Sequence, residues 1–321
     1  MWSPGQPDLV VTGDSATVLP QLPAGSFQMA YLDPPFNTGR RRTGRSAAAT
    51  PPGAVGGDAD PAAAAVTGFR GRTYAQVRRA LHSYDDRFTD YWGFLEPILV
   101  EVRRLLADTG TLYLHLDYRE AHYAKVMLDA LLGRDCFVNE IIWAYDYGGR
   151  SRRRWPTKHD TILMYVKDPD AYFFDSAEVD REPYMAPGLV TAEKAARGKL
   201  PTDVWWHTIV SPTGREKTGY PTQKPEGILR RMVAASTRPG DAVLDPFAGS
   251  GTTGAVASSL GRRYVLVDSN PDAVAVARTR LPGAALTTFP PPPPPKSPKE
   301  LSPKVSHETG SGSSDCSTSR G

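Results

Sequence analysis

The run "DPPF", Asp33 to Phe36, combines residue types that could hold a polar group of a substrate. It follows the apolar stretch "FQMAYL", which predicts a buried strand that ends just before the aspartate. Each proline fixes φ and lacks a backbone donor, so the chain leaves the strand extended, with carbonyl groups free to accept hydrogen bonds. We interpret the run as a shaped acceptor site, for which a simple strand-terminating turn is the alternative.

A second motif, "DPFAGSGTT" at residues 245–253, lies between a predicted strand and a predicted helix. Gly249 and Gly251 lack side chains, so a ligand can approach the backbone and the unpaired N–H groups of the helix N-terminus. A phosphate-binding Walker loop needs a lysine where Thr252 stands, which argues against a P-loop NTPase. The next strand ends at Asp268, whose carboxylate could accept hydrogen bonds from a ribose diol or cap the following helix.

Basic residues cluster in two places, although the formal net charge is only +3 and the pI is near 8.8. The clusters are "GRRRTGR" at 39–45 and "GGRSRRRWPTKH" at 148–159. Clustered arginines favour an anionic partner, and a solvated surface loop is the alternative interpretation for each single residue.

Short apolar runs alternate with helical patterns along most of the chain, which has 321 residues. Strands are predicted at 8–14, 28–33, 111–117, 139–145, 159–166, 242–245 and 264–269, and helices at 91–110, 123–133, 226–237 and 271–281. Such alternation predicts an α/β fold with a mostly parallel sheet that is covered by helices on both faces.

Two segments have compositions that do not favour a packed core. Residues 44–68 are almost all small residues, proline and glycine, and we expect a flexible insertion, spanning about 40–80, beside the "DPPF" run. Residues 289–321 contain a polyproline run followed by polar low-complexity sequence, and we expect them to be disordered. The folded domain is therefore predicted to span 1–288.

The two cysteines, Cys136 and Cys316, lie far apart and show no metal-ligand spacing. We expect a reduced compartment, no disulfide framework and no metal site. The N-terminus lacks a secretory pattern and no apolar run is long enough to cross a bilayer, so we expect a cytoplasmic protein with no membrane partner.

"DPPF" together with "DPFAGSGTT", "YPTQKPEGILRRM" and the N-terminal "GDSATVLPQLPAGSFQMAYLDPPFNTG" resembles the DNA methyltransferases that modify exocyclic amino groups with S-adenosylmethionine. The catalytic motif precedes the cofactor motif, which resembles the beta-type permutation of this family. The resemblance covers about residues 8–282 apart from the insertion. It implies a Rossmann-like methyltransferase fold, an S-adenosylmethionine cofactor and a double-stranded DNA substrate. A candidate target-recognition region lies at 145–221, and a cognate restriction endonuclease and a homodimer are candidate partners.

The resemblance also implies roles for individual residues. An exocyclic amine shares its lone pair with the ring, and acceptors on its two N–H groups favour the pyramidal form that can attack. The Asp33 carboxylate and the Pro34 carbonyl are the implied acceptors, and Phe36 is the face on which an extruded base stacks. The implied catalytic residues are Asp33, Pro34, Pro35 and Phe36. The implied cofactor-binding residues are Thr222, Gln223, Lys224, Pro225, Asp245, Phe247, Gly249, Ser250, Gly251, Thr252 and Asp268. The implied DNA-binding residues are Arg40, Arg41, Arg42, Arg150, Arg152, Arg153, Arg154 and Lys158.

The target base is the least decided feature. Aspartate at the first position of the motif favours N6 of adenine, and N4 of cytosine is the alternative because both amines present the same two donors. An RNA or protein-glutamine methyltransferase and a non-catalytic DNA-binding regulator are further alternatives. The late position of the glycine-rich loop disfavours an RNA or protein-glutamine methyltransferase. The presence of Asp33, Gly249 and Gly251 disfavours a non-catalytic regulator.

Overall fold

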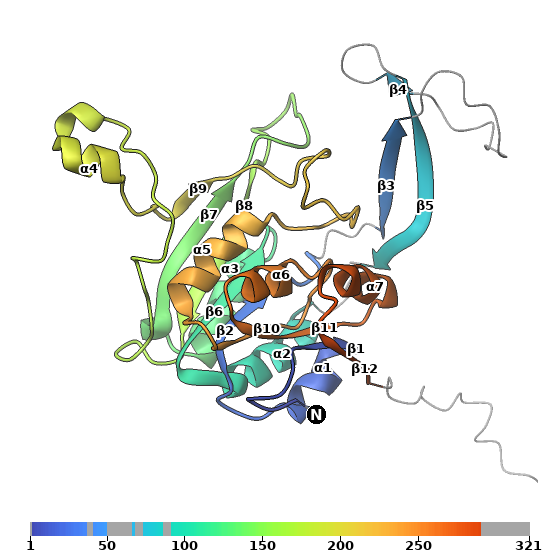
Figure 1. Ribbon diagram of the computed structural model, residues 1–321, viewed down its shortest axis with the longest axis horizontal. Coiled ribbons are helices and arrows are strands. Elements are labelled where there is room, and N and C mark those ends of the chain that lie inside the picture. Colours follow the sequence, from blue (N-terminus) through green and yellow to red (C-terminus); the bar gives the residue numbers. More distant parts are fainter. Residues whose placement is uncertain (1, 37–40, 50–65, 68–72, 86–90, 290–321) are drawn as a thin grey trace, which may run out of the picture. The chain divides into compact units, whose positions relative to one another are not determined.

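The computed structural model describes residues 2–36, 41–49, 66–67, 73–85 and 91–289. Its main feature is a nine-stranded sheet with the strand order β12-β1-β11-β10-β2-β6-β8-β7-β9 (Figure 1). The first six of these strands run parallel to their neighbours, and β8 is antiparallel to both β6 and β7. The predicted α/β class with a mostly parallel sheet is confirmed.

The elements follow one another in the predicted alternating order. The strands of the large sheet are β1 (Leu9–Thr12), β2 (Phe27–Leu32), β6 (Leu106–Leu116), β7 (Phe137–Ala144), β8 (His159–Val166), β9 (Val204–Trp206), β10 (Ala242–Asp245), β11 (Arg263–Asp268) and β12 (Ala285–Thr288). The helices are α1 (Ser15–Val18), α2 (Tyr91–Leu105), α3 (Ala121–Leu131), α4 (Ala192–Arg197), α5 (Glu226–Ser236), α6 (Thr252–Ser259) and α7 (Pro271–Arg280). Short 3₁₀ turns occur at Leu19–Gln21, Arg134–Cys136 and Pro187–Leu189.

Side chains of the sheet alternate between two apolar layers, one on each face. In β6, Leu112 and Leu114 pack with Leu99 in the layer that contains α1, α2 and α3. Tyr113 points the other way and packs with Met232 in the layer that contains α5, α6 and α7. Because both faces are covered, most side chains of the central strands are apolar, as expected for a parallel sheet of this class.

The strand order brings two loops together at one edge of the sheet. Strands β10 and β2 are neighbours, with Leu244 paired to Ala30, although more than 200 residues separate them in sequence. From β2 the chain continues to β6 on one side, and from β10 it continues to β11 on the other side. Ligands of open α/β sheets bind at such a switch point, outside the carboxyl ends of the strands. Asp33 and Asp245 lie at this point.

One helix boundary differs from the prediction. The helix predicted at 91–110 ends at Leu105, and β6 begins at the next residue, so Gly110 lies in a strand and does not stop the helix. The pairing of β6 with β2 shifts register between Phe27 and Met29, which lets the strand begin early. The apolar residues of this segment suit both a helix and a buried strand, so the pattern alone could not place the boundary.

The predicted insertion contains strands that its composition did not indicate. Strands β3 (Arg41–Ala49), β4 (Val66–Thr67) and β5 (Thr73–Asp85) form a separate antiparallel sheet in the order β3-β5-β4. The expected flexibility of this segment stays a prediction. At the other end of the chain, Phe289 belongs to the fold, because its N–H donates to the Thr12 carbonyl (2.8 Å). The remainder of the predicted tail, 290–321, lies outside the described residues.

None of the helices in the described parts of the chain combines the length and the apolar character needed to span a bilayer.

Candidate active site

One cavity of about 1260 Å³ lies over the carboxyl ends of the central strands. It brings together the loop after β2, the glycine-rich loop after β10, the end of β11 and the segment before α5. The predicted site residues that line it are Asp33, Pro34, Pro35, Phe36, Thr222, Gln223, Lys224, Asp245, Phe247, Gly249, Ser250, Thr252 and Asp268. Residues that lie up to 235 positions apart thus share one site.

The loop Asp33–Phe36 contacts a lysine from the far end of the chain. The ammonium Nζ of Lys224 lies 2.5 Å from Oδ2 of Asp33 and forms an ion pair with it. The same ammonium lies 4.9 Å from the ring centroid of Phe36. Phe36 also contacts the imidazole of His115, with ring centroids 5.8 Å apart. The two side chains of the "DPPF" run that are proposed to contact a base are therefore both held by fixed neighbours.

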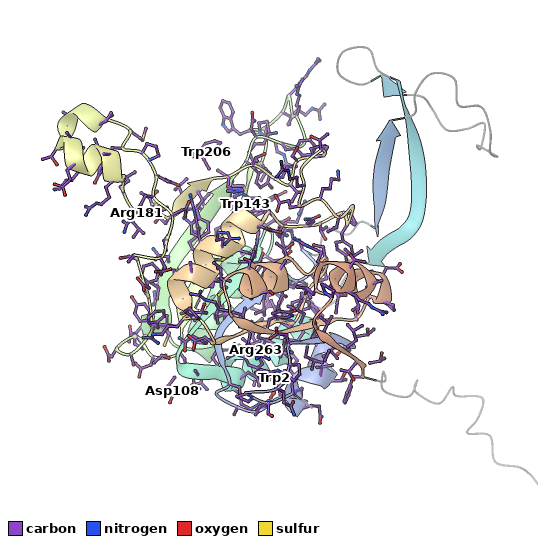
Figure 2. The ribbon with its side chains drawn as sticks, viewed as in Figure 1. Trp2, Asp108, Trp143, Arg181, Trp206 and Arg263 are labelled. Atoms are coloured by element: carbon purple, nitrogen blue, oxygen red, sulfur yellow. The ribbon has the colours of Figure 1, made fainter. Side chains whose placement is uncertain are left out.

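A buried polar network lies under this loop. The hydroxyl of Tyr31 is 2.8 Å from Nδ1 of His115, and Nε2 of His115 is 3.3 Å from the carboxylate of Asp160. The hydroxyl of Tyr145 donates to the other oxygen of Asp160 (3.1 Å). Trp143 packs edge-on against His115 from β7, and Figure 2 shows it inside the body of the fold. The network connects β2, β6, β7 and β8 beneath the part of the cavity that Asp33–Phe36 lines.

The electrostatics of this network keep Tyr31 neutral and Asp160 ionised. Burial raises the pKa of Tyr31, and the nearby carboxylates of Asp33, Asp245 and Asp160 raise it further. Burial would also raise the pKa of Asp160. However, its hydrogen bond with His115, together with nearby positive charge, outweighs burial and lowers the pKa of Asp160.

The glycine-rich loop is fixed by two carboxylates. Asp245 accepts hydrogen bonds from the hydroxyl of Thr253 (2.5 Å) and from the N–H of Phe247 (2.9 Å). Asp268 accepts the N–H of Gly249 (2.7 Å), so the end of β11 binds the backbone of the loop directly. Gly249 adopts φ +50° at the cavity wall. The loop backbone is thus both exposed to the cavity and held in place.

Asp268 is not the N-cap of α7, and its expected contact with a ribose stays a prediction. Its second oxygen accepts the N–H of Asn270 (2.8 Å), which shapes the entry to α7, while Asn270 itself is the N-cap residue. Its carboxylate also lines the cavity. Burial raises its pKa, and the two backbone hydrogen bonds oppose that rise.

Two predicted cofactor residues do not line the cavity. Gly251 is the N-cap of α6 with φ +75°, and a Cβ at this position would lie 2.9 Å from the Cβ of Ala277. Gly251 therefore allows α6 and α7 to pack closely. Pro225 is the N-cap residue of α5, directly before the helix that the sequence predicted at 226–237.

The protonation of Asp245 should make stability depend on pH. Burial is the main cause that raises its pKa from 3.8 to about 7. Between these values the folded protein holds a proton that the unfolded chain releases, so the free energy of unfolding falls as the pH rises from about 4 to 7. We expect the free energy of unfolding of Asp245→Asn to rise by ~2 kcal/mol relative to that of the wild type between pH 5 and pH 8, since each pKa unit is worth ~1.4 kcal/mol. Urea unfolding of the variant and the wild type at both pH values measures these free energies. The same difference between the two proteins at pH 5 and at pH 8 would contradict the prediction.

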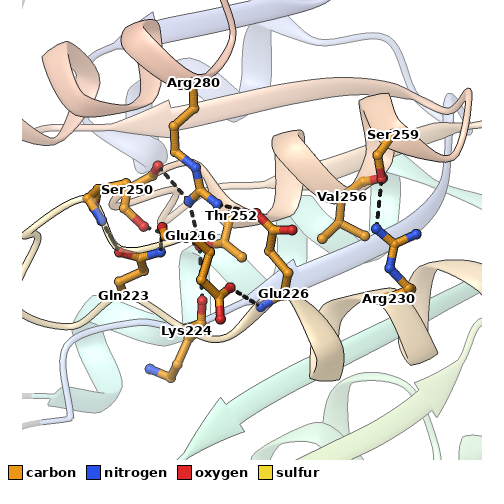
Figure 3. Close-up of polar contacts among 11 residues, drawn as sticks. Glu216, Gln223, Lys224, Glu226, Arg230, Ser250, Thr252, Val256, Ser259 and Arg280 are labelled. Carbon is orange, nitrogen blue, oxygen red and sulfur yellow. Dashed lines mark hydrogen bonds and ion pairs between the residues drawn. The ribbon is translucent and has the colours of Figure 1, made fainter. Parts of the chain in front are cut away.

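The "TQKP" segment is fixed to the glycine-rich loop by an arginine, as Figure 3 shows. Arg280, in the last turn of α7, donates to the Ser250 carbonyl (3.2 Å) and to the Thr252 hydroxyl (3.0 Å), and pairs with Glu226 (2.6 Å). The Thr252 hydroxyl in turn donates to the carbonyl of Lys224 (3.2 Å). The segment before α5 and the loop before α6 therefore form one connected unit.

The basic stretch between β7 and β8 borders the same cavity through Gly148, Gly149 and Thr157. Its arginines Arg150, Arg152, Arg153 and Arg154 are exposed, while Lys158 is half-buried and donates to the carbonyl of Gly148 (3.3 Å). Of the other predicted DNA contacts, Arg40 lies outside the described residues, and for Arg41 and Arg42 only the backbone in β3 is described. The loop between β7 and β8 therefore borders the cavity through its uncharged residues.

Sequence reasoning did not identify the residues that support the site. These are Tyr31, His115, Trp143, Tyr145, Asp160, Tyr220 and Arg280. One signal was available, because His115 is a polar residue within an otherwise apolar strand pattern. In the part of the chain that the structure describes, no group of three or more His, Cys, Asp or Glu side chains is arranged to hold a metal ion.

Comparison with known proteins agrees with this geometry. The family model described as DNA methylase, of the N6/N4 methyltransferase type, matches residues 27–279. The DNA adenine methyltransferase YhdJ of Escherichia coli (strain K12) is 29% identical over 280 residues, which cover 85% of this chain and 82% of that protein. Type II methyltransferase M.HpaI of Haemophilus parainfluenzae is 34% identical over 196 residues, 60% of each chain.

Solved structures share the fold at low sequence identity. The PvuII DNA methyltransferase (cytosine-N4-specific) superimposes with a TM-score of 0.55 and 15% identity, covering 89% of this chain and 99% of that one. The M1.HpyAVI–SAM complex superimposes with a TM-score of 0.52 and 20% identity, covering 85% of this chain and 98% of that one. Since the family model spans most of the chain, the protein belongs to the S-adenosylmethionine-dependent DNA methylases that modify exocyclic amino groups, the N6-adenine and N4-cytosine family.

Proposed function

We propose that this enzyme transfers a methyl group from S-adenosylmethionine to the exocyclic amine of an extruded DNA base, with N6 of adenine as the favoured target. The observation that carries the proposal is the meeting of the Asp33–Phe36 loop and the Gly249 loop in one cavity of about 1260 Å³. Pockets for a single small ligand usually measure ~300–1,000 Å³. This cavity has room for both a nucleotide and a cofactor.

The residues at the glycine-rich end suit the cofactor. The exposed backbone at Gly249 allows close approach, Phe247 gives an apolar wall packed on Phe94 (5.9 Å between centroids), and Asp268 supplies acceptors for a ribose. The carboxylate of Asp268 also lines this end of the cavity, and its negative charge favours a cation. S-adenosylmethionine is cationic and supplies a methyl group already activated for transfer.

The residues at the other end suit the amine. The Asp33 carboxylate and the Pro34 carbonyl accept its two N–H groups, which concentrates the lone pair on nitrogen and directs it toward the cofactor. Phe36 stacks on the ring of the base, and the wall formed by Tyr145 and Asp160 limits its other side. Because the donor is already activated, holding the two reactants in line provides much of the rate enhancement.

Two observations favour adenine. The first motif position is Asp33, and the relative that spans 85% of the chain is described as an adenine methyltransferase. The fold alone does not discriminate, since the cytosine-N4-specific PvuII enzyme shares it. Nucleoside mass spectrometry of DNA methylated by the purified enzyme is the test. We expect N6-methyladenine, and N4-methylcytosine as the sole product would overturn the base assignment while leaving the amine mechanism intact.

The exposed arginines of the basic stretch are proposed to contact phosphates. We expect Arg152→Ala and Arg153→Ala each to weaken binding and to reduce the slope of log K against log salt concentration by about 0.9. A filter-binding series over salt measures the slope. Arg134→Ala is the matched control, because this arginine is also exposed but lies at the opposite end of β7. An unchanged slope would show that the stretch is only a solvated loop.

Further partners follow from the resemblance and the relatives. A DNA substrate supports a cytoplasmic enzyme that acts at the nucleoid. The similarity to the type II enzyme M.HpaI supports a cognate restriction endonuclease. A homodimer is the third proposal, and light scattering of the purified protein with and without DNA tests it.

A further inference from the structure

The catalytic carboxylate is not presented to the cavity as an isolated group. Oδ2 of Asp33 is paired with the ammonium of Lys224, and the side chains are only 15% and 12% exposed. Within the described residues, Oδ1 of Asp33 accepts no hydrogen bond. One oxygen is therefore held and the other is available, which is the arrangement that an incoming N–H donor requires.

The position of the ammonium is fixed by the backbone that carries it. The Lys224 carbonyl accepts the hydroxyl of Thr252, and Arg280 binds both Thr252 and Glu226, which lies two residues after the lysine (Figure 3). A lysine side chain normally loses considerable rotamer entropy when it forms a pair. Here the short distance to a fixed backbone and the contact with Phe36 limit the space that the ammonium can sample.

The surrounding charges make this pairing necessary. Burial is the main cause that raises the pKa of Asp245, and the nearby Asp33 and Asp268 raise it further, while Lys224 also acts on Asp160. Several carboxylates in one partly buried site repel one another, and a carboxylate without a partner would turn away or take up a proton. The ammonium of Lys224 compensates this charge at the one carboxylate that must face the base.

We propose that Lys224 is a positioning residue for Asp33: it holds Oδ2 so that Oδ1 faces the target amine. This inference rests on the proposed function, in which Asp33 accepts an N–H of the base. It differs from the role that the resemblance implies for the "TQKP" segment, which is contact with the cofactor.

The test compares Lys224→Met, which keeps the length and removes the charge, with Lys224→Arg, which keeps the charge. Lys125→Met is the matched control, since this lysine forms an ion pair with Asp129 (3.0 Å) outside the cavity. Calorimetry measures binding of S-adenosylmethionine, steady-state kinetics on a methylatable duplex give kcat and KM, and thermal unfolding gives Tm. We expect Lys224→Met to lower kcat ~10- to 100-fold, the loss typical of a charged hydrogen bond. Cofactor affinity and KM for DNA should stay within about threefold, and Lys224→Arg should recover part of kcat.

Each other outcome would overturn the proposal in a recognisable way. Weaker cofactor binding with unchanged kcat would make Lys224 a cofactor contact. A higher kcat or a lower KM for DNA would show that the ammonium blocks the place of the base. Equal losses of kcat in Lys224→Met and Lys224→Arg, together with a lower Tm, would indicate a structural role. A wild-type enzyme that transfers no methyl group to DNA would instead refute the proposed function, before any variant is compared.

Discussion

Asp33→Ala is expected to abolish methyl transfer to DNA while binding of S-adenosylmethionine stays within about twofold of the wild type. The carboxylate is proposed to contact the amine only, on the β2 side of the cavity, whereas the cofactor end is built from the loops after β10 and β11. Loss of one preorganised group of this kind costs ~10²- to 10³-fold in kcat. Tritium transfer from labelled cofactor measures the first effect, and calorimetry measures the second.

A loss of methyl transfer in Asp33→Ala must be distinguished from a loss of folding stability. Removing Asp33 leaves the ammonium of Lys224 partly buried without its partner, which is itself destabilising. Asp33→Asn keeps one acceptor oxygen and nearly the same volume, so it should retain the fold and a small residual activity. Asp108→Ala is the control for an aspartate outside the cavity, because this side chain is 90% exposed. Activity of Asp33→Ala near that of the wild type, in a folded protein, would refute the acceptor role.

The sequence predicted the parts of the site that lie on loops directly after strands. Asp33, Asp245 and Asp268 each stand at the end of an apolar run, and a parallel sheet brings all such ends to one edge. The motifs could therefore be assigned to one site without any knowledge of strand order. What remained unknown was that β10 and β2 are neighbours, which places the Asp33–Phe36 loop directly beside the glycine-rich loop.

The supporting residues could not be predicted because their partners are distant in sequence. The contact of Tyr31 with His115 spans 84 residues, and that of His115 with Asp160 spans 45. Each depends on the register between β2, β6 and β8, and the pattern of a single strand does not determine register. The ion pair between Lys224 and Asp33 spans 191 residues, so a resemblance based on motifs assigned the two residues to separate functions.

Gly249→Val is expected to reduce cofactor affinity at least ~100-fold in a protein that remains folded. Gly249 adopts φ +50°, and a Cβ here would lie 3.3 Å from Cε1 of Tyr220, which also lines the cavity. A β-branched side chain would strain the backbone by ~1–3 kcal/mol and would project over the surface that the cofactor must approach. It would also disturb the N–H that Gly249 donates to Asp268, and with it the proposed ribose acceptor.

The strain and the obstruction can be measured separately. Gly261 has a similar conformation, φ +72°, but a Cβ there would meet no atom within 4 Å. Gly261→Val should therefore lower Tm through strain alone and leave cofactor affinity unchanged, while Gly249→Val should lower both. Gly249→Ala should have a cofactor affinity between those of Gly261→Val and Gly249→Val, because a single methyl group obstructs less of the cavity. Calorimetry with S-adenosylmethionine and thermal unfolding of the three variants give both quantities. Wild-type affinity in a folded Gly249→Val protein would show that the cofactor does not approach this loop.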